Sequence, residues 1–209
     1  MRTIDILHLE VTPWEVTDAS MREHQQERIR GEREDLIIFV EHPEVVTVGP
    51  RARNEGQAPP PGYATASTDR GGGLTWHGPG QVVVYPIVHW NLEGEANVAA
   101  IIHCLEGWVI AALAELGIEA HRDDRMQGVW VDGRKVCSIG LSFLRWVSRH
   151  GLTVNLDTPA GRVEALAGCG LRPDMTTSLS ALGHDVERAT LVDAMLRTAA
   201  QSLNREPNL

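Results

Sequence analysis

The stretch that decides how this chain is interpreted is Arg70-Gly71-Gly72-Gly73-Leu74-Thr75-Trp76-His77-Gly78-Pro79-Gly80-Gln81. Its glycines let backbone amides approach a ligand without obstruction by a Cβ atom, and Arg70 is suited to hold an anion or a carbonyl group. His77 places a polar group beside Trp76, at the mouth of an expected apolar cleft. The stretch is neither a Walker loop nor a dinucleotide fingerprint, because a predicted strand follows it. The alternative is a surface loop with a solvent-facing histidine.

Strands and helices are predicted on both sides of this glycine segment. We expect strands over residues 36–41, 45–48, 64–67, 82–88, 129–131, 135–141 and 152–156, helices over 14–31, 96–116 and 186–203, and a surface loop over 50–62. The elements show no regular βαβ rhythm, so the expected class is α+β with a mixed or mainly antiparallel sheet packed by helices. The 209 residues favour a single domain, 1–209.

Composition excludes several classes of function. The formal net charge of −9 argues against a nucleic-acid-binding protein. The longest apolar run, residues 82–88, is too short to span a bilayer, and the first residues lack a signal-peptide pattern, so we expect no membrane partner. Three cysteines, Cys104, Cys137 and Cys169, show neither CxxC nor zinc-site spacing. Free thiols in a reducing cytoplasm, without a metal site, are therefore expected.

Lys135 is the single lysine among 19 basic residues; the others are arginines. Lysine differs from arginine because burial or a neighbouring charge can move its pKa, so it can exchange protons. An arginine bias of the whole proteome is the simpler alternative. Alternation along a strand would place Cys137 on the same face as Lys135, which makes this cysteine a rival nucleophile. We rank Cys137 as a packing residue, because free cysteines are commonly buried.

Several motifs resemble those of the lipoyl(octanoyl) transferases. The run over residues 70–86, RGGGLTWHGPGQVVVYP, is similar to that family's RGGxxTxHGPGQxxxYP. Four further matches extend the resemblance over roughly residues 14–180: EHPEVVTVG at 41–49, GVW followed by GRK at 128–135, HGLTVN at 150–155, and CGL at 169–171 followed by TSL at 177–179. The pair Ala167-Gly168 departs from the Val-Pro that is frequent there.

The resemblance implies a fold and a reaction. The implied fold is a biotin/lipoate ligase-like, class II synthetase-like α/β catalytic domain with a mixed sheet. The implied reaction moves an octanoyl group from acyl carrier protein to a lysine of a lipoyl domain, without ATP or a cofactor, as the first step of endogenous protein lipoylation. Cys169 matches the acyl-carrying cysteine, and Lys135 matches the residue that lowers its pKa and acts as general base and acid. The implied acceptors are lipoyl domains of 2-oxoacid dehydrogenases and glycine cleavage proteins.

The resemblance also assigns three substrate-binding segments. They comprise Arg70, Gly71, Gly72, Gly73, Leu74, Thr75, Trp76 and His77; then Ser138, Ile139 and Gly140; then Gly151, Leu152 and Thr153. His77 would either polarise the thioester or only shape its loop. Amides near Ile139, Gly140 or Gly170 could form an oxyanion hole. Arg51, Arg53, Arg122 and Arg125 are hypothesised to form a docking patch for acidic protein partners.

Two other functions compete with acyl transfer. An ATP-dependent lipoate or biotin ligase would use Lys135 for its adenylate and would need no catalytic cysteine. A non-catalytic carrier-binding module would be expected to have lost Lys135 or Cys169, and both are present. The CGL context of Cys169 and the HGPGQ loop favour transfer over ligation.

Overall fold

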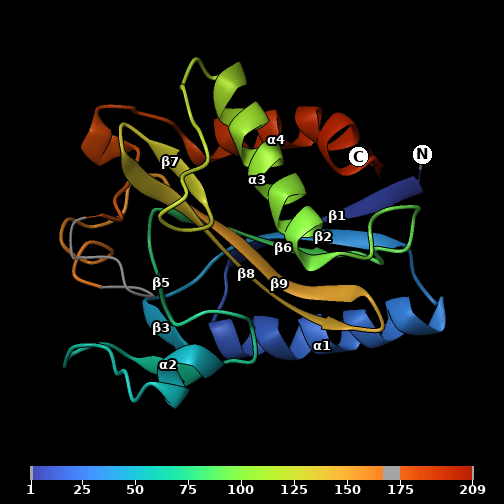
Figure 1. The fold of residues 1–209 in the computed structure, drawn as a ribbon, viewed down its shortest axis with the longest axis horizontal. Helices are drawn as coiled ribbons and strands as arrows, with labels where there is room; N and C mark the ends of the chain where they lie inside the picture. Colours follow the sequence, from blue (N-terminus) through green and yellow to red (C-terminus); the bar gives the residue numbers. More distant parts are fainter. Residues whose placement is uncertain (1, 167–174, 209) are drawn as a thin grey trace.

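A mixed seven-stranded sheet forms the centre of the computed structural model, which describes residues 2–166 and 175–208 (Figure 1). The strand order is β10-β1-β2-β6-β9-β8-β7. β1 pairs in parallel with β10 and β2, whereas the remaining neighbours pair antiparallel. The strands are β1 (Arg2–Val11), β2 (Asp35–Glu41), β6 (Gln81–Ile87), β7 (Val129–Val131), β8 (Arg134–Leu144), β9 (Val147–Asn155) and β10 (Arg205–Asn208). This mixed sheet confirms the predicted class.

A second, three-stranded sheet carries part of the glycine segment. Its order is β4 (Thr65–Ser67), β3 (Val45–Val48) and β5 (Leu74–His77). The sequence predicted only a loop between the strands that end at residue 67 and begin at 82, and β5 corrects this, because its pairing with distant β3 outweighs the local glycine signal. The predicted surface loop 50–62 likewise begins with a short helix, α2 (Pro50–Asn54), in which proline occupies the favoured first turn.

Helices cover both faces of the large sheet (Figure 1). Helices α3 (Val98–Glu115) and α4 (Arg188–Leu203) pack on one face, and α1 (Trp14–Arg30) packs on the other. The sequence of β2 is continuously apolar because both faces of the strand are buried. Ile37 and Phe39 belong to the core under α3 and α4, whereas Leu36 and Ile38 belong to the core over α1. A strand buried on both faces needs apolar residues at every position.

The helix ends follow local chemistry. Gly31 ends α1 in a left-handed conformation with φ 75°, and its N–H donates to the carbonyl of Arg28. The Asn97 side chain caps α3 by accepting a hydrogen bond of 3.1 Å from the Ala100 N–H. Among residues 2–166 and 175–208, α3 is the one helix long and apolar enough to cross a membrane by length and composition alone; one side of it, which includes Trp108, packs into the core.

The β8–β9 hairpin is longer than predicted. Its two-residue turn, Arg145-Trp146, has φ 50° and 61°, the geometry that suits the twist of a hairpin. The first part of β9 carries Ser148, Arg149 and His150, which are polar but buried. This part of the strand therefore lacks the alternation of apolar and polar residues that predicts a strand. The hairpin matters for function because β8 and β9 supply one wall of the site.

Candidate active site

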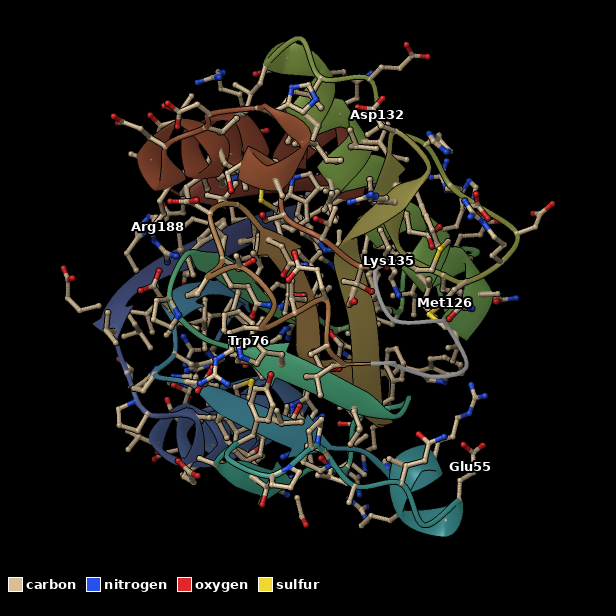
Figure 2. The ribbon with its side chains drawn as sticks, turned by 90° about the vertical axis from the view of Figure 1, so that its left-hand side faces the viewer. Glu55, Trp76, Met126, Asp132, Lys135 and Arg188 are labelled. Atoms are coloured by element: carbon tan, nitrogen blue, oxygen red, sulfur yellow. The ribbon has the colours of Figure 1, made fainter. Side chains whose placement is uncertain are left out.

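A cavity of about 540 Å³ lies between the glycine segment, the β8–β9 hairpin and the start of α3. Figure 2 shows Lys135 on β8 with Met126 and Trp76 to either side, and all three side chains belong to the cavity wall. The wall comprises Arg51, Arg70, Gly71, Gly72, Gly73, Leu74, Thr75, Trp76, Gln81, Val98, Ile102, Arg125, Met126, Gln127, Lys135, Ser138, Ile139, Gly140, Leu141, Phe143, Thr153, Asn155, Val163, Leu166 and Thr176.

Lys135 enters this cavity from the start of β8 and is only 5% exposed. Its backbone N–H donates to the carbonyl of Met175 at 2.8 Å, and its carbonyl accepts from the N–H of Thr177 at 3.0 Å. Gly128 packs so closely that a Cβ atom there would lie 2.5 Å from Lys135 Cε. The lysine is therefore fixed along both its backbone and its side chain. A buried lysine in a cavity is typical of a functional proton donor or acceptor.

A β-bulge separates Lys135 from Cys137. Trp130 lies opposite Lys135, whereas Val129 lies opposite Cys137, so β8 contains one residue more than β7 at this point. The bulge breaks the alternation that predicted a shared face, and that prediction is wrong. Cys137 is fully buried in the core under α3, and it is not part of the cavity wall. Burial raises the pKa of its thiol to about 12, so it is a poor nucleophile.

Arg70 holds the glycine segment together. Its guanidinium donates to the carbonyl of Gly73 at 3.0 Å, to the carbonyl of Gly71 at 3.1 Å, and to Oγ1 of Thr47 at 2.8 Å. The residue is 7% exposed. The guanidinium also donates to the carbonyl of Thr47 at 3.0 Å, so these contacts tie the glycine segment to β3, and binding of a ligand by Arg70 stays a prediction.

The first and second predicted segments touch each other. The Gly71 N–H donates to the carbonyl of Leu141 at 2.8 Å. A Cβ atom on Gly140 would lie 2.8 Å from the carbonyl oxygen of Gly71, which explains why glycine stands there. Ser138, Ile139 and Gly140 all line the cavity together with residues 70–76. Of the expected oxyanion-hole donors, Ile139 and Gly140 lie at the cavity, and Gly170 lies outside the described residues.

The third predicted segment is divided between two spaces. Thr153 lines the large cavity, whereas Gly151 and Leu152 line only a neighbouring void of about 20 Å³. A Cβ atom on Gly151 would lie 2.1 Å from the Val84 carbonyl oxygen, so this glycine permits close contact between β9 and β6. All three predicted segments thus contribute to the cavity, but Gly151 and Leu152 lie behind its wall.

His77 also lies behind the wall, beside the smaller void. Its Nδ1 is 3.0 Å from Gln81 Oε1, and its Nε2 is 3.3 Å from Thr47 Oγ1. Burial, with smaller contributions from the nearby His42 and Arg70, holds the pKa of His77 well below its usual range. The imidazole is therefore neutral, and its contacts join the glycine segment to β3 and β6.

Cys169 lies outside the described residues, as does the pair Ala167-Gly168, which differs from the Val-Pro frequent at these positions. The described chain on either side reaches the cavity, since Leu166 and Thr176 both line it. Cys104 lies on α3, where its thiol donates to the Ser202 carbonyl at 3.0 Å and burial raises its pKa to about 11.

Two of the four arginines of the hypothesised docking patch line the cavity. Arg51 and Arg125 line the cavity with half-exposed side chains. Arg53 instead donates to the carbonyls of Val48 and Thr68, and Arg122 pairs with Glu106. Lining residues that sequence reasoning missed include Gln81 and Asn155, which are joined by a hydrogen bond of 2.9 Å and lie inside the matched motifs, and a set of aliphatic and aromatic side chains: Val98, Ile102, Leu141, Phe143, Val163 and Leu166.

Comparison with solved structures defines the class of fold. The chain superposes on a lipoate-protein ligase A bound with ATP with a TM-score of 0.73 at 14% identity, covering 100% of this chain and 88% of that one. It also matches the biotin protein ligase of Aquifex aeolicus with a TM-score of 0.54 at 15% identity, covering 96% and 69%. The fold is therefore the biotin/lipoate ligase-like catalytic domain.

Sequence comparison defines the family. Residues 12–200 match the model of the lipoyl protein ligase A/B catalytic domain. The octanoyltransferase of Magnetococcus marinus is 35% identical over 207 residues, covering 97% of this chain and 95% of that protein. That of Syntrophobacter fumaroxidans is 38% identical over 159 residues, covering 73% and 69%. The chain belongs to the lipoyl protein ligase A/B catalytic domain family and, within it, to the octanoyltransferases.

Proposed function

We propose that this octanoyltransferase, which transfers octanoyl groups in protein lipoylation, does so through a thioester on Cys169 with Lys135 as its proton donor and acceptor. The donor in this proposal is octanoyl-acyl carrier protein, and the acceptor is a lysine of a lipoyl domain. The observation that supports this proposal most directly is that Lys135 lines the same cavity as Leu166 and Thr176, the described residues on either side of Cys169.

Chain geometry supports the pairing of these two residues. Leu166 lines the cavity and stands three positions before Cys169, a span of at most about 11 Å for an extended chain. On the other side, Met175 and Thr177 are hydrogen-bonded to the backbone of Lys135 itself. The described residues on both sides of Cys169 therefore lie at the walls that surround the lysine.

The reaction divides into two balanced transfers. In the first, the Cys169 thiolate attacks the donor carbonyl, a new C–S bond forms, and the carrier thiol leaves with a proton supplied by the Lys135 ammonium. In the second, the acceptor amine attacks this thioester, its proton passes to Lys135, and Cys169 leaves as a thiolate. Thioester exchange conserves bond energy and amide formation then releases it, so no ATP is required.

The cavity wall suits an aliphatic acyl chain. Ile102 and Val98 from α3 face a cavity that is also lined by Ile139, Leu141 and Phe143 from β8. Contact with such side chains removes apolar surface from water at about 0.8 kcal/mol per methylene group. We therefore place the octanoyl chain along this wall, with its carbonyl toward Lys135.

Intact-protein mass spectrometry tests the proposal. The wild-type chain is mixed with octanoyl-carrier protein without ATP, beside Cys169→Ser and the matched control Cys104→Ser. We expect one octanoyl adduct, released by hydroxylamine, on the wild type and on Cys104→Ser, and none on Cys169→Ser. An adduct that persists in Cys169→Ser would contradict the role of Cys169. Modification of a lipoyl domain that appears only after ATP is added would favour the ligase alternative.

The reducing cytoplasm is the compartment we propose for this reaction. Cys104 and Cys137 are free thiols in the structure, and the proposed intermediate requires a third thiol that is not oxidised. Localisation of a tagged chain by fractionation checks this.

A further inference from the structure

Glu106 is a buried carboxylate that the proposed reaction does not use. It lies on α3, and its side chain is 7% exposed. One carboxylate oxygen accepts a hydrogen bond of 2.8 Å from the Gly128 N–H, and the other accepts one of 3.0 Å from Arg122 Nε. Arg122 also donates to the carbonyl of His103, one turn earlier on α3. Burying a carboxylate is costly unless it is paired, and here both oxygens are paired.

Gly128, the residue that Glu106 holds, is in direct contact with Lys135. A Cβ atom built on Gly128 would lie 2.5 Å from Lys135 Cε and 3.3 Å from its Nζ. Gly128 has φ 130°, a conformation that side chains rarely adopt. The backbone of Gly128 therefore packs directly against the side chain of Lys135.

The same interaction fixes a part of the cavity wall. The segment between Arg122 and Gly128 is anchored to α3 at both ends by the carboxylate of Glu106. Between these anchors lie Met126 and Gln127, which line the cavity. A change at Glu106 thus reaches the site through the backbone of this segment.

We infer that Glu106 is a positioning residue for Lys135: by holding the Gly128 N–H, it keeps the backbone of Gly128 against the lysine side chain and so fixes the ammonium within the cavity. This inference rests on the proposed function for the part that concerns the rate of acyl transfer. Lys135 and Glu106 also both act on the thiol of Cys137. Burial is the largest cause of its raised pKa; after burial, the charge of Lys135 lowers this pKa and the charge of Glu106 raises it.

The single lysine of the chain permits a test that does not depend on activity. In protein labelled with ¹⁵N, one lysine side-chain resonance reports on Lys135 alone. We expect this resonance to shift in Glu106→Gln and in Gly128→Ala. The matched control for the first is Glu115→Gln, a carboxylate on the same helix that is paired with Arg197. An unchanged resonance in both variants would overturn the inference.

The matched control for Gly128→Ala is Gly133→Ala. Gly133 also has a positive φ, of 73°, and it also flanks β7, but a Cβ atom there meets nothing within 4 Å. It therefore also places a side chain at a positive φ, at a lower backbone cost, without the contact to Lys135. We expect the lysine resonance to stay in place in this control.

The rate of the first acyl transfer, measured by single-turnover mass spectrometry, completes the test. A misplacement of about 1 Å costs about 100-fold in rate, and we expect a loss of this order in Gly128→Ala and of at least about 10-fold in Glu106→Gln. KM for the donor should change little, and both controls should match the wild type. Wild-type rates in Glu106→Gln, or a loss that lies wholly in KM, would overturn the positioning role. A wild-type chain that forms no thioester would instead overturn the proposed function, while the lysine resonance still decides the inference.

Discussion

The backbone N–H of Lys135 donates a hydrogen bond of 2.8 Å to the carbonyl oxygen of Met175. The strand that presents the single lysine therefore also holds the chain that follows Cys169. Thr177 completes the link by donating to the Lys135 carbonyl at 3.0 Å. This short parallel contact between distant segments gives the lysine a fixed place relative to Met175 and Thr177, which follow the proposed nucleophile in the chain.

Replacing Lys135 by arginine should separate its charge from its proton exchange. In the proposed arrangement, Lys135→Arg keeps a cation beside Cys169 but cannot release a proton, so we expect the first acyl transfer to slow by about 10²–10⁴-fold. Alkylation of Cys169 should persist in this variant and fall in Lys135→Met, which removes the charge. Stopped-flow transfer and iodoacetamide kinetics measure the two effects. Equal transfer by Lys135→Arg and the wild type would exclude proton exchange by this residue.

The three cysteines should differ in reactivity. Burial raises the pKa of Cys137 to about 12 and that of Cys104 to about 11. At pH 8 the Cys137 thiol is therefore protonated as well as buried, so it should resist iodoacetamide. We expect the native chain to take one label, at Cys169, and the unfolded chain to take three; peptide mapping identifies the sites. Native labelling of Cys137 would contradict its burial.

The half-exposed arginines of the cavity wall should contribute to recognition of the acidic donor protein. Arg51→Glu and Arg125→Glu are each expected to raise KM for octanoyl-carrier protein several-fold, with a smaller effect at high salt, because charges at an interface act mainly on encounter. Arg197→Glu is the matched control, since this exposed arginine on α4 is also paired with a carboxylate. Steady-state kinetics at two salt concentrations measure this KM. An equal KM in all variants would contradict a role of Arg51 and Arg125 in docking.

Buried histidines should make the fold sensitive to acid. Burial lowers the pKa of His42 and of His77 below the ordinary value of 6.5. The unfolded chain therefore binds more protons than the native one below pH 6.5, and the free energy of unfolding should fall as the pH drops, by at most about 1.4 kcal/mol per pH unit for each histidine. His77→Gln should weaken this dependence, whereas His103→Gln, at an exposed position, should not. Urea unfolding between pH 5 and 7 provides the measurement.

Much of the fold could be predicted from local patterns. The apolar runs of β2 and β6 and the glycine that ends α1 each act over a few residues, so the sequence shows them directly. Strand β10 could not be found in this way, because Arg205-Glu206-Pro207-Asn208 is polar and contains a proline. It forms because Arg205 is buried against Asp35 at 2.7 Å and the strand completes the edge beside β1.

By itself, the sequence determined the chemical inventory of this octanoyltransferase: one lysine, three cysteines, and a glycine segment whose order of residues identifies the family. Only the tertiary structure decided which of these residues share a cavity. The bulge in β8 directs Cys137 into the core while Lys135 lines the cavity, and contacts with Gln81 and Thr47 hold His77 behind the wall. Strand register and close packing between distant segments set these positions, and neither is encoded within any short stretch of the chain.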